Sequence, residues 1–216
     1  MSIVESEIDP PAVEEWLAAT SGRLAFDVGA NQGRLTAELA ERFERVMAFE
    51  PCVESVALIY RLALPNVTVV DAAVSDRPGE VRLAEQTSHI AKGQLTSPDF
   101  VGDGAWSSDG GLGWGQVTGW RTVPATTLDV LGRRYAPDFV KVDVEGHEER
   151  VVAGGLRMFS EHRPAFYIEV HDRRRGHAIE SMLAPLYPRL AVIQHPGYAP
   201  GDYGHRNHYW LVSEAR

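Results

Sequence analysis

The chain of 216 residues has 44% hydrophobic and 24% charged residues, an ordinary globular composition that excludes extensive disorder and a membrane-embedded protein. Its formal net charge of −9 argues against a nucleic-acid partner, because proteins that follow phosphates gather Lys and Arg. No run is apolar over the ~18 residues that a membrane span needs, and the start is acidic where a secretory signal would be basic. The single cysteine, Cys52, excludes intramolecular disulfides and a Cys-based zinc site. We therefore expect a cytoplasmic protein without a membrane partner.

Apolar runs alternate with amphipathic segments, which is the pattern of βαβ units and predicts one α/β domain over residues 1–216 with a mostly parallel sheet. We expect an N-terminal helical segment over residues 1–21. The next predicted elements are a strand at residues 23–28, a helix at 33–42, a strand at 46–50, a helix at 53–63 and a strand ending at Asp71.

A Gly- and Trp-rich insertion over residues 86–120 interrupts this alternation and holds Trp106, Trp114 and Trp120. Loops of this length inside a compact domain are usually functional or disordered. We interpret the insertion as a substrate lid, with a floppy insertion as the alternative. Predicted elements around and after it are strands at 79–85 and 120–127, a helix from Thr127 to residue 134, a strand at 138–145, a helix at 148–156, a strand at 165–171, a helix at 176–186 and strands at 189–195 and 207–213.

The turn after the first predicted strand, in the sequence FDVGANQG, has the residues of a nucleotide-sized pocket. Gly29 lets the backbone approach a ligand, and Gly33 can do the same for helix against strand. The three glycines of a dinucleotide-binding loop, G-x-G-x-x-G, are absent, and Asp27 stands where a pyrophosphate would lie. A carboxylate there suits a ligand with a positive ammonium and sulfonium, such as S-adenosylmethionine.

Two further strand ends carry candidate ligand contacts. Glu50, at the end of the second strand, is placed to accept both ribose hydroxyls of a nucleoside. Asp71 and Ala72 follow the third strand and could contact an adenine edge through a carboxylate and a backbone N–H. The alternatives are ordinary turn glycines, a solvated strand end at Glu50 and a simple strand-to-loop boundary at Asp71.

The ordered set FDVGANQG, AFEP, TTLD, KVDVEGHE and YIEVH resembles the FkbM family of S-adenosylmethionine-dependent methyltransferases, over roughly residues 24–171. The resemblance implies the class I methyltransferase (Rossmann-like) fold, with a seven-stranded sheet, an antiparallel last strand and helices on both faces. It implies methyl transfer, usually to an oxygen of a sugar or natural product. The residues that would hold the cofactor are Asp27, Gly29, Asn31, Gly33, Glu50 and the adjoining Pro51. The insertion and the chain after His171 depart from the family pattern, which affects the substrate assignment.

The fourth strand of the parallel sheet should carry the catalytic end of the site. Lys141, Asp143 and Glu145 alternate along it, so a strand that reaches Glu145 turns all three to one face. We predict that Asp143 orients or deprotonates the acceptor hydroxyl. Lys141 would stabilise its charged form or hold it in place.

Methylating a hydroxyl at neutral pH needs a base or a metal ion that acidifies it. Glu145, His147, Glu169 and His171 are candidates for either task, and Asp143 with Glu169 could supply two oxygen ligands to a magnesium-like ion. We do not favour a divalent metal. The alternative for residues 145–148 is a helix start with acids near the positive end of its dipole, and for the two histidines a structural role.

The leading hypothesis is therefore an O-methyltransferase that acts on a hydroxyl of a small-molecule acceptor, with S-adenosylmethionine as cofactor. The alternatives are an N-methyltransferase on a small molecule or peptide, a catalytically silent adenosylmethionine-binding partner subunit, and an NAD(P)-linked oxidoreductase, which Asp27 disfavours. The sequence is compatible with a homo-oligomer.

Overall fold

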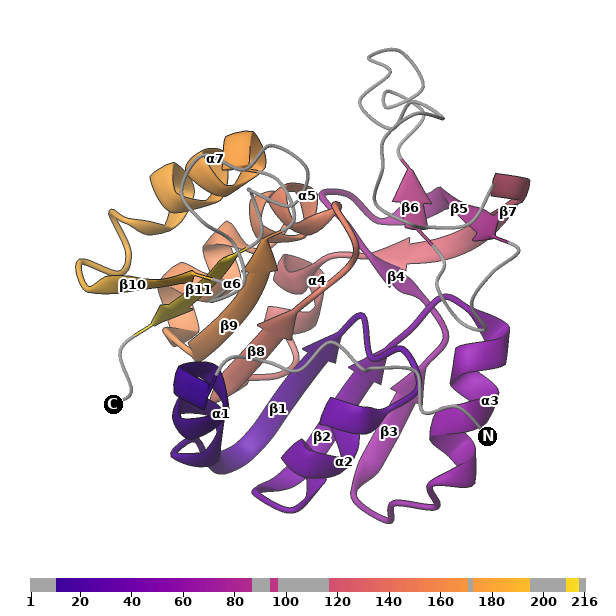
Figure 1. Ribbon diagram of the computed structural model, residues 1–216, viewed down its shortest axis with the longest axis horizontal. Helices are drawn as coiled ribbons and strands as arrows, with labels where there is room; N and C mark the ends of the chain where they lie inside the picture. The colour runs from indigo at the N-terminus through magenta and orange to yellow at the C-terminus, as the bar shows by residue number, and fades with distance from the viewer. Residues whose placement is uncertain (1–10, 87–93, 97–116, 171–172, 195–208, 214–216) are drawn as a thin grey trace.

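A computed structural model describes residues 11–86, 94–96, 117–170, 173–194 and 209–213. Seven strands form the main sheet in the order β10-β11-β9-β8-β1-β2-β3. Their bounds are β1 Gly22–Val28, β2 Phe43–Phe49, β3 Val67–Val70, β8 Phe139–Val142, β9 Ala165–Val170, β10 Leu190–Gln194 and β11 Tyr209–Ser213. Only β11 runs antiparallel to its neighbours, so the predicted mostly parallel sheet with an antiparallel last strand is confirmed (Figure 1).

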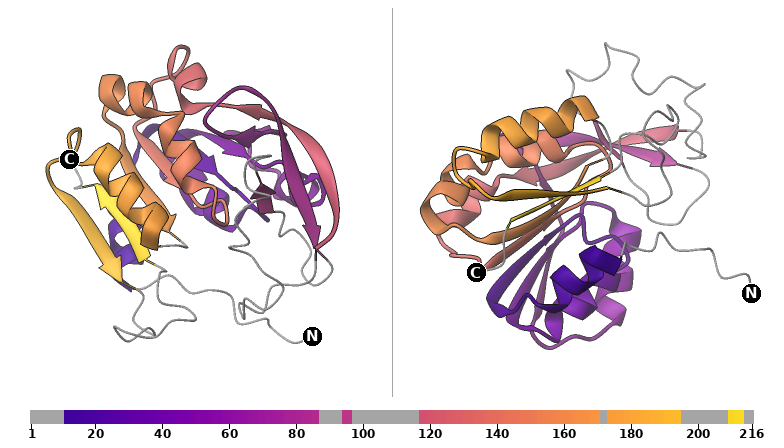
Figure 2. Two further views of the ribbon diagram at one scale, coloured as in Figure 1. Left: turned by 90° about the horizontal axis from the view of Figure 1, so that it is seen from above. Right: turned by 60° about the vertical axis from the view of Figure 1, so that its left-hand side comes forward.

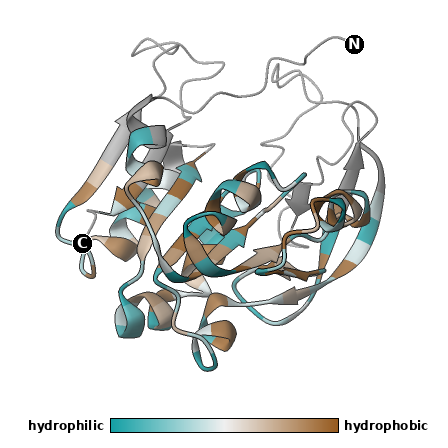
Figure 3. Ribbon diagram, turned by 90° about the horizontal axis from the view of Figure 1, so that it is seen from below, coloured by the Kyte–Doolittle hydropathy of each residue, from teal (hydrophilic) through white to brown (hydrophobic). Residues whose placement is uncertain are grey.

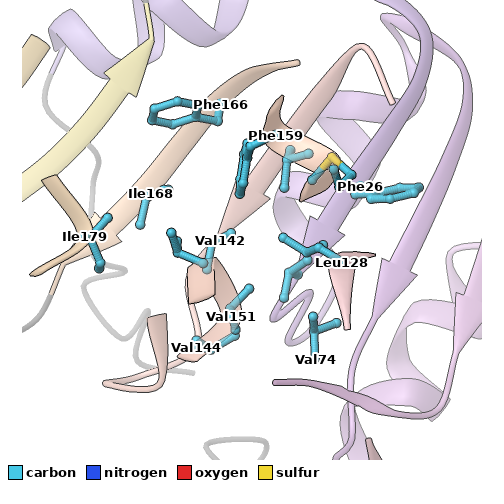
Figure 4. Packing of buried hydrophobic residues seen from close by; sticks show 14 of the residues in the cluster. Phe26, Val74, Leu128, Val142, Val144, Val151, Phe159, Phe166, Ile168 and Ile179 are labelled. Atoms are coloured by element: carbon cyan, nitrogen blue, oxygen red, sulfur yellow. The ribbon is translucent and has the colours of Figure 1, made fainter. Parts of the chain in front are cut away.

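Helices cover both faces of this sheet, and Figure 2 shows the two layers on opposite sides of the strands. The first layer packs Leu17, Leu35 and Leu39 against Ala25 and Phe139 of the strands. The second layer contributes Leu128, Phe159 and Ile179 to the larger core (Figure 4). The helices are α1 Pro11–Ala18, α2 Arg34–Ala40 and α3 Val53–Arg61 in the first layer, and α4 Leu128–Gly132, α5 Glu148–Ala153, α6 Leu156–His162 and α7 Arg173–Leu183 in the second.

The helices are amphipathic, as covering a sheet with one face requires. Figure 3 shows both hydrophilic and hydrophobic residues on the helices that it colours. In α3, for example, Val56 and Ile59 are buried while Tyr60 is exposed. The central strands β1, β8 and β9 are buried along most of their length, because a parallel sheet with two helical layers has no solvated face.

A second sheet lies beyond the carboxyl ends of β1, β2 and β3 (Figure 1). It has the order β4-β7-β5-β6, with β4 Ala73–Val74, β5 Gly79–Gln86, β6 Gln94–Thr96 and β7 Val117–Thr126. Val81, Leu83 and Val123 pack with Cys52 in a small core of their own. The sequence analysis predicted β5 and β7 as strands but did not predict this separate sheet. Most of the Gly- and Trp-rich insertion lies outside the described residues.

Two predicted elements differ from the structure. The predicted helix at 148–156 is two helices, α5 and α6, separated by Gly154 and Gly155. A Cβ at Gly154 would lie 2.1 Å from the carbonyl oxygen of Ser75, the residue after β4. The close approach of the two backbones therefore leaves no room for a side chain at the break between the helices. The predicted strand at 138–145 ends at Val142. The cap of α4 is confirmed, since the Thr127 hydroxyl accepts from the N–H of Val130.

No helix within the described ranges has the length and apolar character that crossing a bilayer demands.

Candidate active site

The turn after β1 is held against two neighbouring strands by its backbone. The N–H groups of Gly29 and Ala30 both donate to the carbonyl of Phe49 at the end of β2, at 3.0 and 3.1 Å. The N–H of Asp143 donates to the carbonyl of Val28 at 3.0 Å. The ends of β1, β2 and β8 therefore form one continuous edge, as expected for ligand sites in parallel sheets.

Gly29 and Gly33 are required by geometry, for reasons that differ from those expected. Gly29 has φ +79, and a Cβ there would lie 1.7 Å from the carbonyl oxygen of Asp143, so its close neighbour is the chain after β8. Gly33 has φ +85, and a Cβ would lie 2.7 Å from Leu62 just after α3. The tight contact at Gly33 is thus with the α3 region, where the sequence analysis expected a strand.

Glu50 lies at the end of β2 and accepts two backbone hydrogen bonds. Its Oε2 accepts from the N–H of Asn31 and its Oε1 from the N–H of Cys52, both at 2.8 Å. The side chain is 7% exposed. Burial outweighs these hydrogen bonds and raises the pKa of Glu50 to about 7. Each carboxylate oxygen retains a lone pair for a ligand donor.

Asp27 is fully buried and does not present a free carboxylate at the edge. Its Oδ2 accepts from the Thr36 hydroxyl at 2.6 Å, and its Oδ1 lies 3.2 Å from the ammonium of Lys141. The two residues are directly opposite each other in the β1–β8 pairing. Lys141 therefore balances the negative charge of Asp27. From the sequence, Lys141 was expected to act on Asp143.

Lys141 joins the turn after β1 to the chain after β8. Its Nζ donates to the carbonyl of Gly29 at 2.6 Å and lies 3.5 Å from Oδ2 of Asp143. Burial alone would lower the pKa of this lysine, but the carboxylates of Asp27 and Asp143 outweigh burial and hold it above its usual range. Lys141 is consequently a permanent cation and a scaffold for the two carboxylates.

Asp143 and Glu169 lie at the carboxyl ends of β8 and β9. The Asp143 side chain is 28% exposed, whereas Glu169 at the end of β9 is 8% exposed. The hydroxyl of Tyr167 lies 3.4 Å from Oε2 of Glu169. Tyr167 pairs with Lys141 across β8 and β9, so the structure brings Lys141, Asp143 and Glu169 to the same region, and Asp143 is the most accessible of the three.

The chain turns at residues 144–146 before α5 begins at Glu148, so the expected alternation of Lys141, Asp143 and Glu145 stops after Asp143. Glu145 has φ 54, in the left-handed region, and is half-buried. His147 is 2% exposed, and its Nε2 lies 2.9 Å from the Ser75 hydroxyl. Burial lowers the pKa of His147 to about 4, so the ring is neutral and joins α5 to the chain after β4.

The remaining sequence-predicted residues are less closely tied to this cluster. Asp71 is exposed just after β3, and the N–H of the buried Ala72 already donates to the carbonyl of Val70 at 2.9 Å. Pro51 is half-buried, and His171 lies outside the described residues. Thr36, the partner of Asp27, was not predicted from the sequence. Glu148 was expected only as part of a helix start, although it is the last residue of the KVDVEGHE motif.

The edge offers polar groups that fit the nucleoside of S-adenosylmethionine. Asn31 has φ 49, and its Oδ1 is buried with no hydrogen-bond partner in the part of the chain that the structure covers. Together with the carboxylate of Glu50 it provides acceptors for hydroxyl and amino donors. Within that same part of the chain, no group of three or more His, Cys, Asp or Glu side chains is arranged to hold a metal ion.

Comparisons with known proteins show the family and the fold. The family model described as "Methyltransferase FkbM domain" matches residues 27–191. No curated protein matches the sequence. An FkbM methyltransferase structure from Methylobacillus flagellatus KT is similar, with a TM-score of 0.58 and 18% identity over 89% of this chain. The chain spans 43% of the length of that protein.

Two other solved structures share the fold. A precorrin-6y C5,15-methyltransferase from Geobacter metallireducens has a TM-score of 0.53 and 13% identity, covering 98% of this chain and 92% of its own. A Streptococcus mutans protein in complex with SAH has a TM-score of 0.53 and 9% identity, covering 95% and 98%. The fold is therefore that of the class I methyltransferases. Since the family match spans most of the sequence, the chain belongs to the FkbM family of S-adenosylmethionine-dependent methyltransferases.

Proposed function

We propose that the protein transfers a methyl group from S-adenosylmethionine to a hydroxyl of a small-molecule acceptor, of the sugar or natural-product type. The observation that carries the proposal is the position of Asp143. It is a partly exposed carboxylate at the carboxyl end of β8, 3.5 Å from a buried, permanently charged lysine. It adjoins the turn after β1, the FDVGANQG segment whose resemblance to the family implies cofactor contacts.

On this proposal the cofactor contacts the turn after β1 and the end of β2. Glu50 accepts the ribose hydroxyls, and Asn31 offers its buried Oδ1. Gly29 and Gly33 hold the turn in the left-handed conformation that brings these groups together. When bound, S-adenosylmethionine supplies a methyl group on a sulfonium, which leaves through cleavage of a carbon–sulfur bond.

Asp143 is the residue that accepts the proton of the acceptor hydroxyl. A hydroxyl oxygen forms the new bond to carbon and must lose its proton, and a carboxylate within hydrogen-bond reach can accept it. Lys141 cannot act as the base, because its neighbours keep it protonated. Lys141 instead holds Asp143 beside Gly29, so that the acceptor oxygen and the cofactor are positioned together. Glu169 lies on the same side and can orient a second acceptor group.

Cofactor binding is tested by thermal unfolding with S-adenosylmethionine or S-adenosylhomocysteine. Either ligand should raise the melting temperature of the wild type, since a ligand that binds only the folded state stabilises it. Glu50→Ala should abolish the increase. Glu44→Ala, an exposed glutamate on the same strand, should retain it. An unchanged melting temperature of the wild type with both ligands would refute the cofactor assignment.

The acceptor is tested by transfer of a labelled methyl group to a panel of hexosides, amino sugars, hydroxylated aromatics and short peptides. We expect a methyl ether product, and Asp143→Asn should lose transfer while it keeps S-adenosylhomocysteine affinity. Products methylated on nitrogen would support the N-methyltransferase instead. Cofactor binding without transfer to any acceptor would support the silent partner subunit, and a tight complex with NADH the oxidoreductase.

The single cysteine, Cys52, is buried and unpaired, which supports a reducing compartment, and we propose the cytoplasm.

A further inference from the structure

The turn that follows Asp143 is held by one buried carboxylate. Glu148, the first residue of α5, is 1% exposed. Its Oε1 accepts from the N–H of Gly146 at 2.8 Å and from the N–H of Val144 at 3.3 Å. One oxygen therefore binds the N–H groups of the two residues that flank Glu145, which belong to the 143–144 and 145–146 peptide groups.

The turn needs such a clamp because its backbone is unfavourable. Glu145 and Gly146 are successive left-handed residues, with φ 54 and 98. A left-handed residue other than glycine costs about 1–2 kcal/mol, and the free N–H groups that the turn buries would add to this cost. Charged hydrogen bonds to backbone N–H groups are about twice as strong as neutral ones, so Glu148 can offset the strain.

Other contacts hold the outside of the turn. The guanidinium of Arg175 in α7 donates to the carbonyl of Gly146, and His147 lies against Ser75. These contacts join the turn to neighbouring elements, whereas Glu148 determines the conformation within the turn. Asp143 is the residue that precedes it, and its backbone lies against Gly29. The side-chain direction of Asp143 therefore depends on the turn that Glu148 stabilises.

The cofactor side of the edge is held by a separate set of bonds. Glu50 binds the backbone of Asn31 and Cys52, and the N–H groups of Gly29 and Ala30 donate to Phe49. Glu148 is not a partner in any of these bonds. A disturbance of the Glu148 clamp should consequently reach the acceptor side and leave the cofactor side intact.

We propose that Glu148 is a positioning residue for methyl transfer, which fixes the turn at residues 144–146 and thereby sets Asp143 and Glu145 for the acceptor without contributing to cofactor affinity. The inference rests on the proposed function. It assigns to Glu148 a role in turnover that a simple helix start would not have.

The test compares variants that separate geometry from charge. Glu148→Gln keeps an oxygen that can accept both N–H groups but removes the charge. Glu148→Asp keeps the charge but shortens the side chain, so that it no longer reaches both groups. Glu148→Ala removes both properties. Glu149→Ala is the matched control, because it removes the same charge from the same first turn of α5.

The measurements are S-adenosylhomocysteine affinity by calorimetry, and kcat with the panel hexoside or other hydroxyl compound that the wild type methylates fastest. We expect Glu148→Ala and Glu148→Asp to lower kcat roughly ten- to hundredfold, the loss that misplacement by about 1 Å produces. Glu148→Gln should recover most of the rate, and Glu149→Ala should match the wild type. S-adenosylhomocysteine affinity should be the same in all five proteins.

Hydrogen exchange supplies a readout that needs no acceptor. The amides of residues 144–146 should exchange faster in the Ala and Asp variants than in the Gln variant, while those of residues 29–33 stay unchanged. Equal kcat for the Asp variant and the wild type, or a Gln variant as slow as the Ala variant, would overturn the proposal. So would a loss of S-adenosylhomocysteine affinity parallel to the loss of kcat. Failure of the wild type itself to bind the cofactor or transfer methyl would instead count against the proposed function.

Discussion

The two sides of the sheet edge use buried carboxylates in different ways. On the cofactor side, Glu50 accepts backbone N–H groups from its own loop and from the turn after β1. On the acceptor side, Glu148 plays the corresponding part for the turn at residues 144–146. The side chain of Glu50 faces the cofactor-binding turn and is proposed to bind ligand directly, whereas Glu148 acts through Asp143.

Lys141 is the residue that unites the two sides. Its ammonium contacts the carbonyl of Gly29 and the carboxylate of Asp27 on one side, and Asp143 on the other. A substitution that leaves Lys141 in place can therefore alter turnover and cofactor binding separately. Substitution of Lys141 itself should reduce both cofactor binding and turnover, whereas a substitution away from Lys141 should reduce only one of them.

The largest effect is expected at Gly29, where the backbone of the turn after β1 contacts the backbone of Asp143. Gly29→Ala would place a Cβ 1.7 Å from the Asp143 carbonyl at a residue with φ +79, so it should destabilise the protein by roughly 5 kcal/mol or prevent folding. Gly79→Ala is the control, since Gly79 has φ +135 but no atom within 4 Å of the added Cβ, and it should cost only the backbone strain of about 1–3 kcal/mol. Urea unfolding of both variants measures this. Equal losses would mean that backbone strain, and not the contact with Asp143, explains the glycine.

The next effect concerns the buried ion pair. Lys141→Met preserves the volume but leaves Asp27 as a buried carboxylate without its cation, which should cost about 3–5 kcal/mol. The double variant Asp27→Asn with Lys141→Met removes both charges and should recover much of this loss. Chemical denaturation of the single and double variants gives the coupling energy. If the double variant is as unstable as the single one, Lys141 stabilises the fold through its hydrogen bond to the Gly29 carbonyl and not through its ion pair with Asp27.

Much of the main sheet is predictable from the sequence because its signals are local. The apolar runs, the turn glycines Gly29 and Gly33, and the capping Thr127 each act through neighbouring backbone. The sequence could not reveal that Gly29 is needed because of Asp143, since these residues are distant in the chain and meet only through the β1–β8 pairing. The end of β8 at Val142 was not expected, because the alternation of charged residues at positions 141, 143 and 145 is also the pattern of a continuing strand.

The second sheet and the break between α5 and α6 depend on contacts that no local pattern encodes. The strands β5 and β7 pair over many intervening residues, so each looks like an isolated strand. The break follows from the approach of Gly154 to Ser75. For the candidate site, the sequence predicts which residues meet at the strand ends, but not the contacts among their side chains. The sequence gives no sign that Asp27 contacts Lys141 and Thr36, because these residues meet only in the folded chain.

A smaller effect should appear in the pH dependence of stability through Glu50. Its pKa is raised from 4.5 to about 7 by burial, so the folded state favours the protonated acid. The corresponding stability is complete below pH 4.5 and is lost as the pH rises through about 7, by up to roughly 3 kcal/mol. The unfolding free energy of the wild type relative to Glu50→Gln should therefore decline over this range. A flat difference between pH 4.5 and 8 would show that Glu50 ionises normally.

The smallest effect is the opposite trend at His147, on the acceptor side. Its pKa is lowered from 6.5 to about 4 by burial, so the folded state favours the neutral ring. The stability that it contributes is complete above pH 6.5 and is lost as the pH falls through about 4, by up to roughly 3 kcal/mol. His147→Gln should lose less stability than the wild type between pH 6.5 and 4.5, measured by urea unfolding. Over this interval the ring is only partly protonated in the folded state, so the loss is smaller than the full amount. Parallel curves for the two proteins would mean that the ring gains solvent or a carboxylate partner when it becomes charged.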